Sequence, residues 1–224
     1  MANKIKIDII SDVVCPWCII GYKRLTKAIS KMGIEDMIEL EWQPFELNPD
    51  MPVEGEDVQI YGARKYGRTP EEGIRSRANI AKLGAQAEFV FDFFDEMKIV
   101  NTQDAHILLD YAKESAKQTE LKMRLFEAFF CERKDISDQQ VLAQELQTVG
   151  LNVEEALATL EDDVIRERVQ SQKSYWHGLG VSSVPTVVFN NSSAITGAQP
   201  IDVYKQVLTE LMGKKKCILN EQLF

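Results

Sequence analysis

Residues 4–18 read KIKIDIISDVVCPWC, and this stretch decides the fold. Its first half alternates isoleucine with lysine or aspartate, which is the pattern of a β-strand and predicts one over 4–11. Its second half ends in two cysteines separated by two residues, Cys15 and Cys18, and an amphipathic run with helical spacing continues to Met32. The sequence therefore predicts that the cysteine pair lies where a strand ends and a helix begins.

The same sheet is predicted to continue at two other places in the chain. Residues 37–43 alternate again, and Gly33 is a suitable end for the helix before them. Far along the chain, 184–189 reads VPTVVF, a β-branched strand that begins with proline, and a short strand follows it. An amphipathic helix is expected at 200–212, with Gly213 ending it. The predicted order is βαβ and, much later, ββα.

The chain between these halves is predicted to be all helical. Its apolar residues recur at three- and four-residue spacing, which predicts helices at 56–66, 70–85, 102–113, 118–133, 137–149, 153–160 and 162–178. We therefore expect an α/β domain made of residues 1–55 and 173–224, and a helical insertion domain at 56–172.

Composition narrows the function classes. The 224 residues are 45% hydrophobic and 27% charged, which is typical of a folded globular protein, and the formal net charge is −9. Such a charge disfavours nucleic acid or an anionic membrane surface as the main partner. No run approaches the roughly 20 apolar residues of a membrane span, and the first residues alternate like a strand rather than forming a signal peptide. We therefore expect a cytoplasmic location.

The position of the cysteine pair predicts redox chemistry. Unpaired backbone N–H groups and the helix dipole favour a thiolate at a helix N-terminus, so we expect a lowered pKa at Cys15. Cys15 would attack a disulfide, and Cys18, one turn further along, would resolve the mixed disulfide. Pro16 suits the first turn of a helix, where its missing N–H costs nothing. Trp17 offers an aromatic contact for a substrate beside the reactive sulfur.

A zinc site is the alternative interpretation of two cysteines at this spacing. It would need a second pair of ligands, but Cys131 and Cys217 stand far apart and have no cysteine or histidine neighbour at ligand spacing. We therefore expect no metal. Cys131, within an apolar helix, is predicted to be a buried structural thiol, and Cys217, after three lysines, an exposed one.

Pro185 has two interpretations at the start of its predicted strand. A cis bond before proline is usually a specific turn feature, and it would leave the backbone of Val184 free to pair with an extended substrate beside Cys15. An ordinary trans proline on an edge strand is the other interpretation. The residues alone leave both open.

These features resemble the DsbA-like branch of the thioredoxin superfamily, and more narrowly the FrnE-like dithiol–disulfide isomerase group, over nearly the whole chain. The segments that carry the resemblance are 11–18 with Gly21, 42–49, 101–102 with 105–106, and 197–200. The resemblance implies a thioredoxin-like α/β fold with a helical insertion, a cis Pro185, Cys15 as attacking thiol and Cys18 as resolving thiol. It implies no cofactor beyond the redox-active pair, with thiol or disulfide substrates that are proteins or glutathione.

Two other functions remain open. The same architecture is shared with 2-hydroxychromene-2-carboxylate isomerases and kappa-class glutathione transferases, which bind glutathione and typically carry serine where Cys15 stands. A chaperone-like module that holds thiol peptides without turnover is the third hypothesis. Trp17, Trp42 and Phe45 could supply its surface, and Trp42, Phe45 and His106 are the candidate substrate-binding residues. His106 is either a proton donor near the thiols or a helix-surface or satisfied core histidine. His177, which precedes the Val-Pro strand, could approach the thiols.

Overall fold

The computed structural model describes residues 4–221, with side chains up to residue 213. Its centre is a four-stranded sheet in the order β2-β1-β5-β6. The strands are β1 Ile5–Ser11, β2 Ile38–Pro44, β5 Thr186–Phe189 and β6 Ser193–Thr196. β1 and β2 are parallel over their full lengths, while β5 is antiparallel to both β1 and β6. The mixed pairing is that of the predicted βαβ and ββα halves, joined edge to edge through β1.

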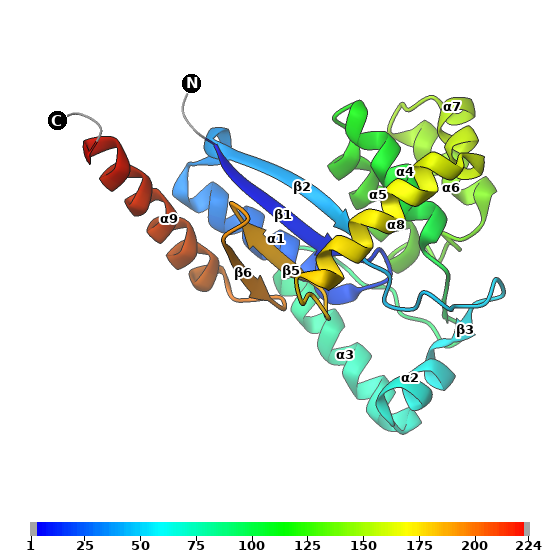
Figure 1. Cartoon of the computed structure of the whole chain (residues 1–224). Coiled ribbons are helices and arrows are strands. Elements are labelled where there is room, and N and C mark those ends of the chain that lie inside the picture. The colour runs from blue at the N-terminus through cyan, green and yellow to red at the C-terminus, as the bar shows by residue number, and fades with distance from the viewer. Residues whose placement is uncertain (1–3, 222–224) are drawn as a thin grey trace.

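Helices cover both faces of this sheet (Figure 1). On one face, Ile7 and Ile9 of β1 share a core with residues of α1 Pro16–Met32 and α9 Ile201–Glu221. On the other face, Ile10 packs with Trp176 of α8 Asp163–Gly178. The two faces of β1 differ: Ile5, Ile7 and Ile9 make one face apolar, whereas Lys6 and the buried Asp8 share the other face with Ile10.

The two helices on the first face end differently from each other. α1 begins with Pro16 in its first turn and ends at Gly33, whose φ of 62° is left-handed, as the sequence predicts. α9 does not end at Gly213 but continues to Glu221. A glycine inside a helix costs only about 1 kcal/mol, so without a left-handed turn it does not terminate one. Cys217 lies in this extension, outside the described side chains.

The insertion consists of helices at the predicted places. Their bounds are α2 Val58–Tyr66, α3 Pro70–Gln86, α4 Gln103–Glu114, α5 Gln118–Phe130, α6 Gln139–Thr148 and α7 Val153–Ala158, with a short 3₁₀ turn at Thr159–Glu161. Another 3₁₀ turn, Glu35–Met37, lies outside the insertion, between α1 and β2. The insertion is not entirely helical, however. β3 Glu56–Asp57 pairs with β4 Lys98–Ile99 in an antiparallel ladder, and Asp57 then caps α2, so the helix expected from residue 56 begins at Val58.

The insertion has two parts, seen in Figure 1. α2 and α3 extend away from the sheet as an arm, and α4 to α7 form a bundle beside β2. α8 runs without a break across the predicted domain boundary between residues 172 and 173. Its Lys173 forms a buried ion pair with Glu46, and the Trp176 indole donates to Gln43. One continuous apolar core therefore extends from the sheet into the bundle.

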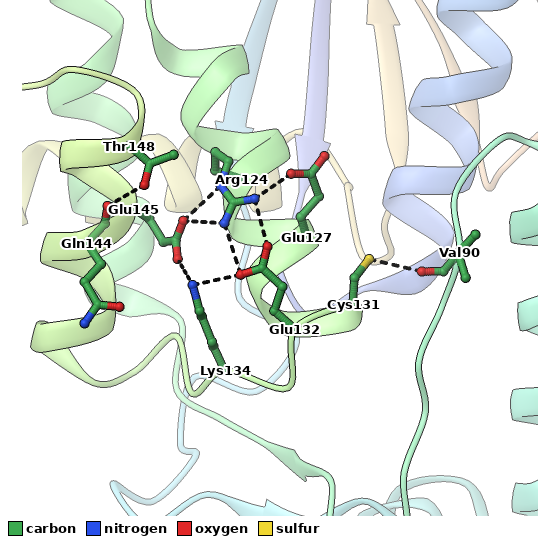
Figure 2. A network of polar contacts seen from close by, with 9 residues as sticks. All are labelled: Val90, Arg124, Glu127, Cys131, Glu132, Lys134, Gln144, Glu145 and Thr148. Carbon is green, nitrogen blue, oxygen red and sulfur yellow. Dashed lines mark hydrogen bonds and ion pairs between the residues drawn. The ribbon is translucent and has the colours of Figure 1, made fainter.

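A network of charged residues fastens the end of α5 to α6 (Figure 2). The Arg124 guanidinium contacts Glu127, Glu132 and the buried Glu145 at 2.7, 3.0 and 2.7 Å. Lys134 closes the network, 2.8 Å from both Glu132 and Glu145. Rigid placement of this end of α5 matters because the chain at 88–97 is attached to it.

That attachment is made by neighbouring polar contacts. Arg133 forms a two-point ion pair with Asp92. The Cys131 thiol donates to the Val90 carbonyl at 3.0 Å, and Figure 2 shows this contact. On its other side, the Phe91 ring occupies the place where a Cβ of Gly84 would stand, only 2.4 Å away. The 88–97 segment is therefore held between α3 and α5.

Candidate active site

Cys15 and Cys18 lie at the first turn of α1, as predicted. Cys15 is the residue before the helix, with extended φ and ψ of −96° and 109°, and its N–H donates to the Asp12 carbonyl at 3.3 Å. The N–H of Cys18 donates to the Cys15 carbonyl at 3.0 Å. Both cysteines are free thiols. The turn therefore presents two neighbouring sulfurs at the end of β1.

Only one of the two thiols faces a cavity. Cys15 lines a cavity of about 290 Å³ and is 3% exposed, whereas Cys18 is 0% exposed and does not line it. Pro16, Val184 and the 37%-exposed Trp17 lie on the same wall. A substrate that enters the cavity can therefore reach the sulfur of Cys15 but not that of Cys18.

The remaining wall comes largely from the insertion. It includes Tyr61 and Tyr66 of α2, Arg77 and Ile80 of α3, Phe93 and Met97 of the 88–97 segment, and Phe130 of α5. Among the residues that the structure describes, those lining this cavity include Arg68 and Arg77 but no aspartate or glutamate. In a chain with 35 acidic residues and a net charge of −9, such a lining favours a partly apolar ligand that carries negative charge.

The Val184–Pro185 bond is cis, which confirms the prediction from the resemblance. The Cys15 thiol donates to the Val184 carbonyl at 3.8 Å, so this segment lies across the thiol from α1. Gly21 allows the close approach, because a Cβ at this position would stand 3.2 Å from Cγ of Pro185. Cys15, Pro16, Trp17, Val184 and Pro185 are thus brought together.

A buried carboxylate lies beneath the turn of the thiols. Asp12 is fully buried, accepts the N–H of Leu47 at 2.7 Å, and lies 3.3 Å from Nε2 of His106. Burial by itself raises the pKa of Asp12, but the contact with His106 outweighs it and the pKa is lowered. His106 is therefore a buried partner of Asp12, and it does not line the cavity.

The acidities of the two thiols differ from the prediction. The hydrogen bond with Cys18 raises the pKa of Cys15 well above its ordinary value, and burial adds to this. Burial alone would raise the pKa of Cys18 too, but hydrogen bonds from Cys15 and Ser11 lower it. The N–H of Cys18 does favour a Cys15 thiolate, as expected for a helix N-terminus, but it is outweighed. The structure therefore does not bear out the expected lowered pKa of Cys15, because the two buried thiols hydrogen-bond to each other and titrate as a pair.

The structure places the other predicted substrate contacts in the interior. The Trp42 indole donates to Thr119 at 3.0 Å and joins β2 to α5. Phe45 is buried on the α8 face of the sheet, and its ring lies 5.0 Å from that of His177. Neither aromatic residue, nor His177, lines the cavity. The sequence could not distinguish them from surface aromatics because they stand beside the turn-rich segment that leaves the sheet.

Cys131 lies outside the site. Cys131 is half-buried rather than fully buried, and desolvation raises the pKa of its thiol to about 11. Within the part of the chain that the structure describes, no cluster of three or more His, Cys, Asp or Glu side chains could hold a metal ion.

Sequence reasoning missed Lys122 of α5, which is buried beside the rings of Trp42 and Phe126. Its ammonium interacts electrostatically with Cys18, Asp12 and Cys15. A signal was present, since Lys122 shares a helix face with Leu125, Phe126 and Phe129, all of them buried. A lysine on an otherwise apolar helix face indicates either that the face has been assigned to the wrong residues or that the ammonium is buried.

Comparison with known proteins decides the family. Residues 6–209 match the DSBA-like thioredoxin domain. The chain belongs to this family. It is similar to the crystal structure of a probable DsbA oxidoreductase, SCO1869, from Streptomyces coelicolor, with 28% identity, a TM-score of 0.88, and coverage of 93% of this chain and 90% of the other. The fold and the chemical class, oxidoreductase or isomerase of the DsbA-like family, follow from these findings.

Two further proteins extend the comparison. The chain is 26% identical to the uncharacterized protein YwbO of Bacillus subtilis (strain 168), over 94% of this chain and 99% of that protein. The structure of the cytosolic disulfide reductase DsbM from Pseudomonas aeruginosa with GSH has a TM-score of 0.64 at 17% identity, covering 92% of this chain and 99% of that one. At this identity the second likeness concerns the fold alone.

Proposed function

We propose that this DsbA-like protein is a thiol–disulfide oxidoreductase that exchanges disulfides through Cys15 and Cys18. The proposal rests on the different positions of the two sulfurs. That of Cys15 lies on the cavity wall, and that of Cys18 lies directly behind it. An attacking thiol must reach the substrate, and a resolving thiol must reach only the attacking one.

The different exposure of the two thiols sets the order of steps. The Cys15 thiolate attacks a substrate disulfide, which forms a mixed disulfide and releases one substrate thiolate. That thiolate takes up the proton from Cys18. The Cys18 thiolate then attacks the sulfur of Cys15, releases the second substrate thiolate, and leaves a Cys15–Cys18 disulfide. The substrate gains two electrons and the pair loses two, and the reverse sequence oxidises a dithiol.

We place this reaction in the cytoplasm, where a dithiol pair is kept reduced and functions as a catalyst rather than as a structural bridge. The name of DsbM as a cytosolic disulfide reductase supports the same compartment. Within the described residues, no helix has the length and apolar character needed to cross a membrane.

Single-cysteine variants test the proposal. Cys15→Ser should abolish the reduction of a disulfide substrate such as insulin, because no other thiol among the described side chains lines the cavity. Cys18→Ala should accumulate mixed disulfides on Cys15, which mass spectrometry of adducts captured from cell extract would identify. Cys131→Ala, which removes a thiol with a raised pKa outside the cavity, is the matched control and should behave as wild type. Insulin reduction that survives Cys15→Ser would contradict the proposal, and peptide binding that is indifferent to Cys15 would favour the chaperone-like module.

Glutathione is the second candidate reactant, and the lining of the cavity favours it. Glutathione carries two carboxylates, and Arg68 and Arg77 line the cavity beside Cys15 without a competing acid. The DsbM structure with GSH shows that this fold accommodates the tripeptide in that protein. Arg77→Gln should raise the KM for glutathione while leaving the rate with uncharged dithiothreitol unchanged. If instead Cys15→Ser retains a glutathione-dependent activity on a small molecule, the isomerase or transferase function replaces the oxidoreductase.

A further inference from the structure

A second cavity, of about 430 Å³, lies next to the cavity that Cys15 lines. Leu47 and Asn48 line both cavities, so the segment after β2 belongs to the wall between them. Helix α2 forms the other part of this wall, because its Tyr61 lines the thiol cavity whereas its Lys65 lines the second cavity. The two cavities are therefore separated where α2 meets residues 47–48.

Lys65 makes the contact that closes this wall. Its ammonium donates to the Leu47 carbonyl at 2.7 Å and to Oδ1 of Asn48 at 2.8 Å. The acceptor side is fixed, because the Leu47 N–H donates to the Asp12 carboxylate and the Asp12 carbonyl accepts the N–H of Cys15. Breaking the contact would therefore release the end of α2 and leave the turn of the thiols in place.

The side chain of Asn48 depends on Lys65 for its orientation. Oδ1 of its amide accepts from Lys65, and Nδ2 is buried without a hydrogen-bond partner among the described residues. A buried donor without an acceptor is unfavourable, and the carbonyl of a ligand would satisfy it. Without Lys65, the amide can turn toward such an acceptor, because its oxygen has lost the ammonium that held it. Removing one ammonium should therefore release α2 and open the wall at Asn48.

We propose that Lys65 is a specificity-determining residue for the disulfide exchange proposed above, on which this inference rests. Its contact with residues 47–48 closes the thiol cavity toward the second cavity. The protein therefore favours disulfides small enough for the first cavity over peptide disulfides that need both. A peptide disulfide binds only those molecules in which the contact is open, so its apparent affinity is reduced by that fraction. The peptide carbonyls of such a substrate are the acceptors that the amide of Asn48 lacks.

Lys65→Met tests this inference with two disulfides of different size. The small one is 2-hydroxyethyl disulfide, and the large one is glutathione disulfide, in which two tripeptides are joined. Loss of the two charge-assisted hydrogen bonds should raise kcat/KM for glutathione disulfide about tenfold, through a lower KM. The kcat/KM for the small disulfide should stay the same. Loss of a positive charge would by itself weaken the binding of this anionic disulfide, so the expected change is opposite in sign to a simple charge effect.

Two further variants control for the charge and for the donors. Lys82→Met removes the same charge from an exposed position of α3 that lines neither cavity, so it should not raise kcat/KM for glutathione disulfide. Lys65→Arg keeps hydrogen-bond donors at the wall and should keep the wild-type preference. A kcat/KM for glutathione disulfide that is unchanged or lower in Lys65→Met would overturn the inference.

Binding to an unreactive protein separates this inference from the proposed function. Cys15→Ser has no attacking thiol at the cavity, so calorimetry can measure the Kd of glutathione disulfide without reaction. That Kd should be about tenfold lower when Lys65→Met is added to Cys15→Ser. Equal Kd values, or no binding to either protein, would overturn the inference even where the wild type reduces 2-hydroxyethyl disulfide normally. If the wild type reduces neither disulfide, the proposed function fails and the inference fails with it.

Discussion

Asp12 shows how a single buried residue serves both the fold and the thiols. Its carbonyl accepts the N–H of Cys15, and its carboxylate accepts the N–H of Leu47 and contacts His106. The side chain therefore ties the start of α1 to the segment after β2 and to α4. Its negative charge also lies close enough to raise the pKa of Cys15. Structural and electrostatic roles are combined in one carboxylate.

Asp12→Asn separates these roles. Asparagine keeps an acceptor oxygen but loses the charge, so the pKa of Cys15 should fall and its alkylation by iodoacetamide at neutral pH should become faster. The exposed Asp36 offers a control, since Asp36→Asn removes the same charge from the protein surface. An alkylation profile of Asp12→Asn that coincides with the wild type would show that the charge does not act on the thiol.

The stability of the same variant should depend on pH in a defined direction. The folded-state pKa of Asp12 lies below its ordinary value of 3.8. A carboxylate of this kind contributes stability that is present above its unfolded pKa and is lost as the pH falls through the folded pKa. As the pH falls below about 4, the free energy of unfolding, measured with denaturant, should therefore decrease less for Asp12→Asn than for the wild type.

Among the elements, α5 and α6 depend on the charged network around Arg124. Glu145 is fully buried, yet it accepts from both Arg124 and Lys134, so its charge is compensated. Hydrogen bonds from Arg124 and Lys134 lower the pKa of Glu132 to about 2. Since the folded pKa is depressed, this contribution is complete above the ordinary value of 4.5 and is lost as the pH falls toward 2.

Glu145→Gln should destabilise the protein by about 2 kcal/mol, because it weakens three charge-assisted hydrogen bonds from Arg124 and Lys134 and leaves these two cations with less compensation. Glu127 contacts Arg124 from the surface and provides the matched control, since exposed ion pairs contribute about 0–1 kcal/mol. Urea unfolding monitored by circular dichroism would measure both. Equal losses for Glu145→Gln and Glu127→Gln would mean that burial of Glu145 adds nothing to the network.

At this scale the sequence predicted the helices and strands well, and the reasons for its failures are physical. Amphipathic periodicity located α2 to α8 to within about three residues, because each helix buries one face. β3 and β4 contain two residues each, too few to show any alternation. The end of α9 was misplaced because Gly213 is a weak stop without a left-handed turn.

For the molecule as a whole, the candidate site is assembled from both halves of the chain. The turn from 15 to 18 and the proline at 185 could be predicted, because a motif and a resemblance fix their roles locally. The cavity wall could not be predicted in this way. Tyr61 and Arg77 look like ordinary surface residues of amphipathic helices, and only the packing of the α2–α3 arm brings them to Cys15. The same holds for Lys122, whose burial depends on the packing of α5 against Trp42 of β2.

This shared construction predicts that the sheet and the bundle unfold as one cooperative unit, although the sequence suggested two domains. The apolar core is continuous, and Leu125 of α5 is fully buried within the same cluster as Ile7 and Ile9 of β1. Leu125→Ala should cost about 2–5 kcal/mol, through lost apolar contact and the cavity left behind. If the core is one unit, that loss must appear in the sheet as well as in the bundle.

Hydrogen exchange of the β1 amides measures the loss at the sheet directly. The protection of Ile7 and Ile9 should fall in Leu125→Ala by the same free energy as the protection of α5, and circular dichroism and tryptophan fluorescence should show coincident unfolding transitions. Leu179→Ala makes the same substitution at a 61%-exposed position and should leave the exchange of β1 unchanged. If β1 kept its full protection in Leu125→Ala while α5 lost its own, the insertion would be a separate folding unit, and its contact with the thiol site would then have to form between two independently stable domains.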